Sequence, residues 1–406
     1  MVIPATLFGR GYKLTFVHED KTESSRSSGN LVEYNTGHIY ELASEPISSS
    51  KLHSFMNEYQ TDSTIKICSY NHNLKTFGEP TLIKSDQKYT IDKGGSYFIE
   101  PGARVTLDTG NTPVDKLMIV GDSKFERSQV TQVSDVKLKN MGYFTVLNID
   151  LEFTDKDGFN MVEPSENVKW IEFERCIIRY NSSKSIISSS TASIDRLVLY
   201  DNDIIFTKHT NLHFASSGIN GTPIYKEVIL DNNLFYHTGS YDASSGVGFM
   251  LLAGNAANKK INQLVLDHNT FVNLKVYSSN PYYIGGTFQE TKIYVHQNLF
   301  YMPNLSDGTN YRLLANAHST GCDKYGVTYY TGPSDTGPSA TSPIFKYSNH
   351  STLVEGQNKE FRLTDKPFTN IDPEKGIFEK GTSLFPSDAS EIGAVRPLPV
   401  DRPIER

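Results

Sequence analysis

Apolar residues in the middle of the chain recur in short alternating runs, each followed by a polar turn and a second short apolar run. The clearest copies read WIEFERCII from Trp170, LVLYDNDII from Leu197, VILDNNLF from Val228, LVLDHNTF from Leu264 and IYVHQNLF from Ile293. Alternation of apolar and polar residues over such short stretches predicts β-strands with one buried face. The central part of the chain is therefore predicted to be all-β.

The copies return at a nearly regular spacing. We assign the polar turn to Cys176, Asp203, Asn233, Asn269 and Asn298, and the apolar residue two positions later to Ile178, Ile205, Phe235, Phe271 and Phe300. The steps between these apolar residues are 27, 30, 36 and 29, and a weaker copy ends at Phe153. One residue type at one turn of successive repeats is typical of a solenoid, in which each Asn hydrogen-bonds to the Asn of the next coil. A β-sandwich also has many short strands, but it does not predict this repetition.

A third short strand precedes each copy of the pattern. These strands begin at Val136, Phe159, Ser185, Leu212, Phe249, Tyr282 and Arg312. Three strands and one variable loop per repeat predict a right-handed parallel β-helix with three strands per coil, because each strand then hydrogen-bonds to its counterpart one coil away. We expect an N-terminal β-rich cap or small domain at 1–80, the parallel β-helix at 81–345 and a capping tail at 346–406 that covers the end of the solenoid.

Composition narrows the partners. The net charge of -7 and the pI of about 5.9 argue against nucleic acid, which requires a basic surface. Hydropathy predicts no membrane-spanning segment. Cys68, Cys176 and Cys322 form neither a disulfide framework nor a metal-ligand spacing, so we expect no metal and no cofactor.

The repeats resemble those of a known superfamily. LVLDHNTF (264–271), IYVHQNLF (293–300) and VILDNNLF (228–235) resemble the turns of the pectin-lyase-like superfamily, and EIGAVRP near the C-terminus resembles the end of several secreted bacterial β-helix proteins. More narrowly, the chain is similar to β-helix proteins of the polysaccharide-utilisation systems of gut Bacteroidetes. The resemblance implies a polysaccharide partner and an extracellular or cell-surface location, and it is specific for the fold rather than for the chemistry.

In that superfamily the strand before the first turn lines the substrate groove. The resemblance therefore places a groove on the strands that begin at Val136 to Arg312, with the loop 237–248 as a wall. The candidate catalytic residues are His213, Tyr283 and Arg312, because calcium-free lyases use such side chains to neutralise a uronate carboxylate and to move protons. The candidate substrate-binding residues are Lys137, Lys139, Lys208, His237, Tyr241 and Asp242.

Acidic residues favour other chemistries only weakly. A Ca²⁺-dependent lyase needs an acidic cluster in the groove, and Asp155, Asp157 and Glu163 come nearest to one, although solvated turn carboxylates explain them as well. A hydrolase needs two or three Asp residues on adjacent coils of the groove. The repeated acids are instead expected beside the Asn turn, and they are Asp201, Asp203, Asp231 and Asp267.

Three functional hypotheses remain open at this point. His213 and Tyr283 are expected about 10 Å apart and His213 and Arg312 about 14 Å apart, which suits contacts to successive sugars better than one reacting centre. The first hypothesis is therefore an extracellular protein that binds a complex, acidic polysaccharide for its capture or breakdown. The second is a polysaccharide lyase that acts by β-elimination, as pectate lyases do, and the third is a structural or adhesin β-helix. The sequence leaves open whether the protein is an enzyme.

Overall fold

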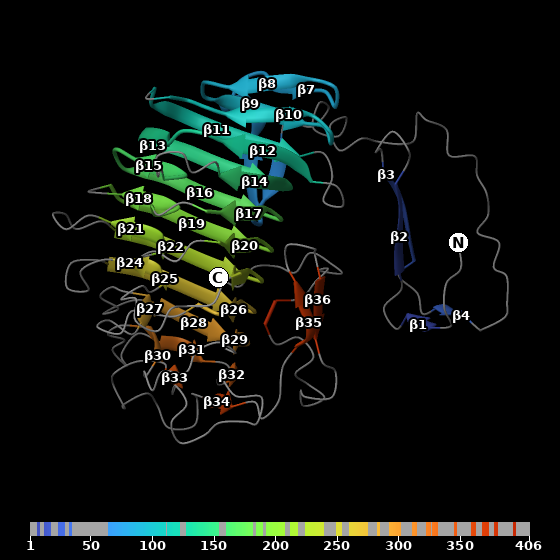
Figure 1. Cartoon of the computed structure of the whole chain (residues 1–406), viewed down its shortest axis with the longest axis vertical. Helices are drawn as coiled ribbons and strands as arrows, with labels where there is room; N and C mark the ends of the chain where they lie inside the picture. Colours follow the sequence, from blue (N-terminus) through green and yellow to red (C-terminus); the bar gives the residue numbers. More distant parts are fainter. Residues whose placement is uncertain are drawn as a thin grey trace. The chain divides into compact units, whose positions relative to one another are not determined.

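The structure is a computed structural model of the whole chain (Figure 1). It describes residues 64–110, 112–121, 127–153, 160–181, 184–189, 192–207, 224–238, 260–274, 292–301 and 393–394, together with the backbone of the strands that lie outside these ranges. The chain divides into two units, Met1–Ile65 and Lys66–Arg406. In the first unit β1 (Thr6–Phe8) pairs antiparallel with β4 (Val32–Tyr34), and β2 (Tyr12–Val17) pairs antiparallel with β3 (Glu23–Ser28).

An eleven-stranded parallel sheet runs through the second unit. Its strands, in order, are β8 (Lys88–Ile91), β10 (Arg104–Leu107), β12 (Ser128–Gln132), β14 (Ile149–Phe153), β17 (Ile177–Tyr180), β20 (Asp203–Phe206), β23 (Leu234–His237), β26 (Thr270–Val272), β29 (Asn298–Tyr301), β32 (Val327–Thr331) and β34 (Lys359–Arg362). Neighbours in this sheet are one sequence repeat apart, so the sheet grows by one strand per repeat (Figure 1).

Two further parallel ladders share the strand β13 (Val136–Leu147). The β7–β31 ladder contains β7 (Thr81–Ile83), β9 (Gly95–Ile99), β11 (Val114–Gly121), β13, β16 (Val168–Glu174), β19 (Ile194–Tyr200), β22 (Ile224–Asp231), β25 (Lys260–Asp267), β28 (Lys292–His296) and β31 (Cys322–Tyr325). The β13–β33 ladder contains β13, β15 (Val162–Pro164), β18 (Ile187–Ser189), β21 (Leu212–Ser217), β24 (Phe249–Ala253), β27 (Tyr282–Ile284), β30 (Tyr311–Leu314) and β33 (Phe345–Lys346). The molecule is thus all-β with long stacked parallel sheets, an arrangement that is compatible with a β-helix.

Two hairpins complete the described elements. β5 (Thr64–Ile67) pairs with β6 (Tyr70–Asn73), and a short 3-10 helix, η2 (Leu74–Thr76), follows directly. The Asn73 side chain accepts a hydrogen bond of 3.0 Å from the backbone nitrogen of Lys75 and so caps this helix. β35 (Phe368–Asp372) pairs antiparallel with β36 (Ile377–Lys380).

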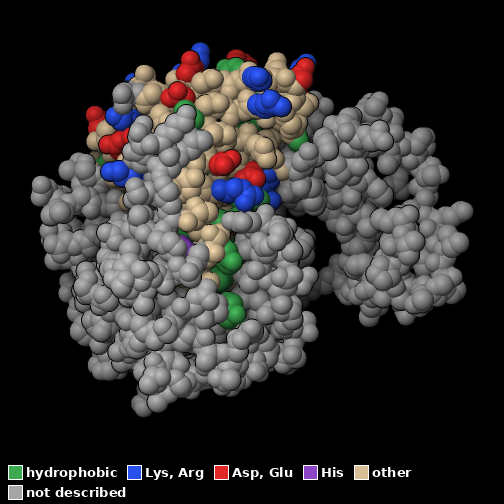
Figure 2. Space-filling view, viewed as in Figure 1, with side chains coloured by type: hydrophobic (Ala, Val, Ile, Leu, Met, Phe, Trp, Pro, Cys, Tyr) green, Lys and Arg blue, Asp and Glu red, His purple; other side chains and the backbone are tan. Residues whose placement is uncertain are grey.

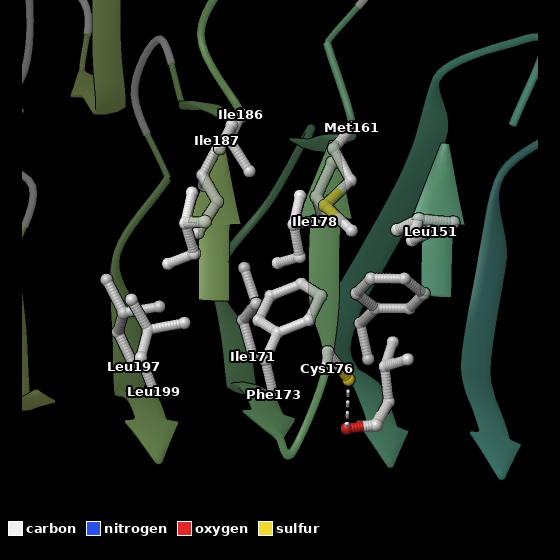
Figure 3. Close-up of a cluster of buried hydrophobic side chains, with 14 of the residues drawn as sticks. Leu151, Met161, Ile171, Phe173, Cys176, Ile178, Ile186, Ile187, Leu197 and Leu199 are labelled. Carbon is white, nitrogen blue, oxygen red and sulfur yellow. Dashed lines mark hydrogen bonds between the residues drawn. The ribbon is translucent and has the colours of Figure 1, made fainter. Parts of the chain in front are cut away.

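The interior between the sheets is filled by aliphatic and aromatic side chains. Leu151 and Ile178 from the eleven-stranded sheet, Ile171 from the β7–β31 ladder and Ile187 from the β13–β33 ladder point into one cluster, and all are at most 1% exposed (Figure 3). Inward residues of successive strands also stack on each other. The ring of Phe271 lies parallel to the ring of Phe235 at 5.0 Å and to that of Phe300 at 4.6 Å. The predicted Phe column is therefore confirmed.

The polar turn after the β7–β31 strands is a ladder of asparagines. The Oδ1 atoms of Asn233, Asn269 and Asn298 each accept hydrogen bonds from both the backbone nitrogen and the Nδ2 atom of the Asn one repeat earlier, at 2.9–3.1 Å. Asn202 Oδ1 accepts one from the backbone nitrogen of Cys176 at 2.9 Å. The Asn residues of the ladder are Asn202, Asn233, Asn269 and Asn298, and all are fully buried. Each Nδ2 atom also donates to a strand carbonyl, so the buried amides of the turn are paired.

Two residues of the predicted register were wrong by one position. The ladder passes through Asn202 and not through Asp203, and Ile178 aligns with Ile204 and not with Ile205. The physical reason is that the residue before the ladder position is left-handed in each of these repeats. In this repeat that residue is Asp201, with φ 57, so Asn202 takes the ladder position, and the sequence does not reveal which residue is left-handed. The weaker copy was also misaligned, because Leu151 and not Phe153 aligns with Ile178.

A short segment near the C-terminus packs on the stack beside the Asn ladder. The backbone nitrogen of Gly393 donates to the carbonyl of Gln297 at 2.7 Å, and that of Ala394 donates to Thr270 Oγ1 at 2.8 Å. Gly393 has φ +68, and a Cβ atom there would lie 2.8 Å from the Cβ of Leu299. Glycine is therefore required for this close approach.

Candidate functional site

The predicted catalytic residues lie on three strands of the β13–β33 ladder: His213 on β21, and Tyr283 and Arg312 on the neighbouring strands β27 and β30, which β24 separates from β21. His213 in β21 aligns with Met250, and Arg312 in β30 aligns with Tyr282 rather than with Tyr283. The structure describes the backbone but not the side chains of these three predicted residues. Lys208, Tyr241 and Asp242 lie outside the described residues, as do Asp155 and Asp157. The role of these residues in ligand binding therefore stays a prediction.

Two predicted lysines lie on β13, at the start of the same ladder. Lys137 is half-buried and aligns with Glu163 on β15. The side chain of Lys139 is 52% exposed, and its Nζ lies 3.5 Å from Asp115 Oδ1. An exposed pair of this kind is weak and easily exchanged for a ligand anion. Lys139 is thus exposed on the surface. Basic and acidic side chains are interspersed on the face drawn in Figure 2.

His237 does not fit the role predicted for it. The residue ends β23, where it aligns with Phe206, and it is 0% exposed. A fully buried imidazole does not offer its nitrogens to a sugar on the surface. We therefore leave His237 out of the proposed binding surface.

A cluster of one carboxylate and two imidazoles lies at the Asn turn. Asp267 ends β25 and aligns with His296, which ends β28. His268 follows Asp267 in the left-handed conformation, with φ 51. Asp267 Oδ1 lies 2.6 Å from His268 Nδ1 and 3.4 Å from His296 Nδ1, and the two imidazole centroids are 5.8 Å apart. These side chains could hold a metal ion.

The sequence reasoning missed this cluster although a signal was present. Asp267 was expected to lie beside the Asn turn, and that prediction is confirmed. His268 and His296 were not considered as its partners. His268 lies one residue before the ladder asparagine Asn269, in DHN at 267–269. In the next repeat, His296 lies two residues before Asn298, in HQN at 296–298. Alignment of the repeats on the asparagines brings them together.

A second polar cluster is buried between the β5–β6 hairpin and the outer face of the β7–β31 ladder. Glu172 on β16 is fully buried, and its Oε1 accepts a hydrogen bond of 2.7 Å from Nε of Arg196 on β19 and forms an ion pair with Nη2 of the same guanidinium at 2.6 Å. His72 on β6 places Nε2 2.9 Å from Glu172 Oε2, without the alignment of a hydrogen bond. Thr145 Oγ1 is 3.4 Å from the same Oε2 atom. The carboxylate therefore faces several donors.

Aromatic rings hold the guanidinium of Arg196 in place. Its central carbon lies 3.4 Å from the ring centroid of Tyr70 and 4.8 Å from that of Trp170. The Tyr70 hydroxyl donates to Glu227 Oε2 at 2.9 Å, which ties the hairpin to β22. Stacking on two aromatic rings and pairing with Glu172 together fix the hairpin on the ladder.

The two described cysteines are buried, and Cys68 lies near the charges of Glu172 and Arg196. Burial, together with the nearby charges of Glu174 and Glu172, raises the pKa of the Cys68 thiol well above its ordinary value. Burial also raises the pKa of Cys176 to about 12. Because the thiolate is the reactive form, neither residue is suited to act as a nucleophile near neutral pH.

A surface ion pair joins the same two strands as the buried one. Asp195 on β19 lies 3.3 Å from Lys169 Nζ on β16 and 2.7 Å from Lys226 Nζ on β22. Desolvation raises the pKa of Asp195, but the hydrogen bonds and charges of the two lysines outweigh it, so that the pKa is lowered. This pair contributes to strand cohesion and has no evident chemical role.

Comparisons with protein-family models, with curated proteins and with solved structures gave no match. In the part of the chain that the structure describes, no helix has the length and apolar character needed to cross a membrane. The class of protein is thus defined by its all-β architecture of stacked parallel sheets. Its function must be inferred from the strand ladders and the side-chain clusters described above.

Proposed function

We propose that the chain is a right-handed parallel β-helix with three strands per coil, and that it binds an acidic polysaccharide outside the cell or at its surface. Strand order supports the coil. The chain visits the β13–β33 ladder, the β7–β31 ladder and the eleven-stranded sheet in turn, as in β15, β16 and β17, then β18, β19 and β20. Parallel strands joined by such crossovers are right-handed in nearly all proteins, which supports the proposed hand.

The observation that carries the binding proposal is the β13–β33 ladder. Its parallel pairing aligns strands that are far apart in the sequence, so that Lys137, His213, Tyr283 and Arg312 belong to one long row of strands. Neighbouring strands lie about 4.8 Å apart, so the strands of His213 and Arg312 are about 14 Å apart. A ligand that contacts all of these strands must be extended, as a polysaccharide is.

Charge favours an acidic glycan. Lysine and arginine on this ladder include Lys137, Lys139 and Arg312, although the chain as a whole carries a net charge of -7. Arg binds carboxylate and sulfate groups through paired hydrogen bonds, and tyrosine rings pack on sugar faces. A uronate-containing or sulfated polymer therefore fits this row of strands better than a neutral one does. Along the ladder, His213 and Arg312 stand at one set of alternating positions, and Lys137 and Tyr283 stand at the other.

Affinity electrophoresis in gels that contain acidic polysaccharides tests the proposal. We expect a panel of uronate-containing and sulfated polymers to retard the parent protein, and a neutral polymer to retard it less. The double variant Tyr283→Ala/Arg312→Ala should lose retardation. The control variant Arg104→Ala removes an exposed arginine from β10 of the eleven-stranded sheet and should bind as the parent does.

The outcomes separate the competing functions. If none of the polymers retards the parent, the binding proposal is wrong and a structural or adhesin role takes its place. If the double variant binds as well as the parent, the site lies elsewhere on the molecule. A lyase is the second candidate, because His213 and Tyr283 supply proton-transfer groups on the same ladder. Release of unsaturated oligosaccharides that stops in His213→Ala would replace the binding function with β-elimination.

A further inference from the structure

Two neighbouring repeats bring three metal-ligating side chains to the Asn turn. The parallel register of β25 and β28 aligns Asp267 with His296, and the left-handed turn residue His268 stands directly beside Asp267. Asp267 and His268 are at most 5% exposed. The backbone nitrogen of His268 donates to the carbonyl of His296 at 3.1 Å, which fixes the two turns against each other.

We propose that Asp267, His268 and His296 bind one divalent transition-metal ion, for which Zn²⁺ is the best-fitting candidate. Each side chain offers one ligand atom, and these three atoms all lie within 4.8 Å of one another. One carboxylate and two imidazoles form a ligand set that suits Zn²⁺ and other first-row divalent ions. This proposal does not rest on polysaccharide binding. The cluster lies where the strands β25 and β28 of the β7–β31 ladder end, and not on the β13–β33 ladder.

The distances suit a tetrahedral ion with small adjustments. Zn–N and Zn–O bonds of about 2.0–2.1 Å place tetrahedral ligand atoms roughly 3.3 Å apart. The 3.4 Å separation of His296 Nδ1 from Asp267 Oδ1 agrees with this value. The 2.6 Å separation of His268 Nδ1 from the same oxygen is a hydrogen-bond distance, so a rotation of the carboxylate or the imidazole must accompany binding by this nitrogen.

A separate observation points to a ligand. His296 Nδ1 is a buried atom that has no hydrogen-bond partner among the described residues, although the His296 side chain as a whole is 29% exposed. A buried polar nitrogen without a partner is costly, and coordination of an ion would satisfy it. The 29% exposure of the His296 side chain places this part of the cluster near the surface. A hydrogen bond between Asp267 and His268 alone would explain their contact but not the orientation of His296.

Isothermal titration calorimetry of the full, metal-free chain with Zn²⁺ is the test. We expect one tight site per chain, and we expect Ca²⁺ and Mg²⁺ in excess not to compete, because nitrogen ligands disfavour these ions. The variant His296→Ala should lower the affinity for Zn²⁺ by more than about 100-fold, because loss of a group that only hydrogen-bonds to a metal ligand typically costs about 10–100-fold. The matched control Lys292→Ala removes an exposed residue from the same strand, β28, and should bind Zn²⁺ as the parent does.

Co²⁺ provides a second readout that separates ligation from folding. The parent loaded with Co²⁺ should show the intense visible bands of a tetrahedral site, and these bands should be absent from His296→Ala and from Asp267→Asn. Circular dichroism of each metal-free variant shows whether it is folded, and His296→Ala, at a partly exposed position, is the variant on which the result depends. Absence of a tight site in the parent, or unchanged Zn²⁺ binding and unchanged Co²⁺ bands in a folded His296→Ala, would show that the three residues are only hydrogen-bonded turn residues.

Discussion

The buried pair of Glu172 and Arg196 permits a controlled test of what holds the β5–β6 hairpin on the ladder. The perturbation is Glu172→Gln, which keeps the size of the side chain and removes its charge. In the parent, one carboxylate oxygen accepts a hydrogen bond from Arg196 Nε and pairs with its Nη2, and the other faces His72 at 2.9 Å. The substitution leaves the guanidinium without its counter-charge between the rings of Tyr70 and Trp170.

The expected loss follows from the burial of the two partners. Removal of one partner from a buried ion pair typically destabilises a protein by about 3–5 kcal/mol. The Glu172 side chain is 0% exposed, whereas the Arg196 side chain is 17% exposed, so water can solvate part of the unpaired guanidinium. We therefore expect a loss near the lower end, about 3 kcal/mol.

The same strands supply a matched control. Lys169 on β16 and Asp195 on β19 form an ion pair of 3.3 Å in which both side chains are partly exposed, at 34% and 26%. Exposed pairs contribute about 0.2–1 kcal/mol, so Lys169→Ala should destabilise the protein by no more than about 1 kcal/mol. The two variants thus compare a buried pair with a partly exposed pair between the same two strands, and Asp195 keeps its contact with Lys226 at 2.7 Å in Lys169→Ala.

Native-state hydrogen exchange is the appropriate assay, because stacked sheets can open locally and a single unfolding transition need not report on one region. Amides of β6, β16 and β19 should exchange roughly 100-fold faster in Glu172→Gln, in line with about 3 kcal/mol, and less than about 10-fold faster in Lys169→Ala. Amides of β8 and β10 provide an internal reference. Equal exchange rates in the two variants would refute the reasoning, since burial would then make no difference to the value of the pair.

Three other predictions follow from described contacts. Phe271→Ala removes the middle ring of a fully buried stack and should lower the free energy of unfolding by about 3–5 kcal/mol, and an unchanged denaturation midpoint would contradict the Phe column. Burial raises the pKa values of Cys68 and Cys176, so iodoacetamide at pH 8 should label their peptides only in denaturant, and native labelling detected by mass spectrometry would be contrary to the structure. Pairing with two lysines lowers the pKa of Asp195, although desolvation opposes this shift. The parent should therefore be more stable than Asp195→Asn by less than about 1 kcal/mol near pH 7. Urea titrations at a series of pH values should show this difference disappearing as the pH falls below 3.8 and through the folded pKa of Asp195.

The repeating part of the fold could be predicted from the sequence because each repeat contains the same pattern of apolar and polar residues. A strand with one buried face alternates with period two, and a turn that must pair its amides with the next coil selects asparagine. Asn233, Asn269 and Asn298 were therefore placed correctly, as was the Phe column beside them. The register slipped where the turn reads Asp-Asn-Asp at 201–203, because both acids resemble a turn residue and only the backbone shows which position is left-handed.

The sequence contains no comparable signal for the buried pair of Glu172 and Arg196 beneath the hairpin. Tyr70 lies 157 residues before Glu227 and His72 lies 100 residues before Glu172, and no periodicity links the hairpin to the repeats. Glu172 itself was hidden by its context. In the stretch WIEFE it occupies a polar position of an alternating strand, which predicts an exposed side chain, and only the hairpin that covers the ladder makes it buried.

The turn shows how a repeating fold keeps structural and chemical roles apart. At the ladder position the side chain must both accept and donate hydrogen bonds within a buried column, so asparagine recurs at 202, 233, 269 and 298. The preceding position shares a left-handed backbone but not one side-chain type, and its occupants are Asn148, Arg175, Asp201, Asn232, His268 and Gln297. Because the side chain at this position is not dictated by the ladder, it can change from coil to coil without loss of the turn. His268 beside Asp267 occupies such a position, and for this reason we regard the Asn turn, along with the β13–β33 ladder, as a place where this protein can carry chemistry.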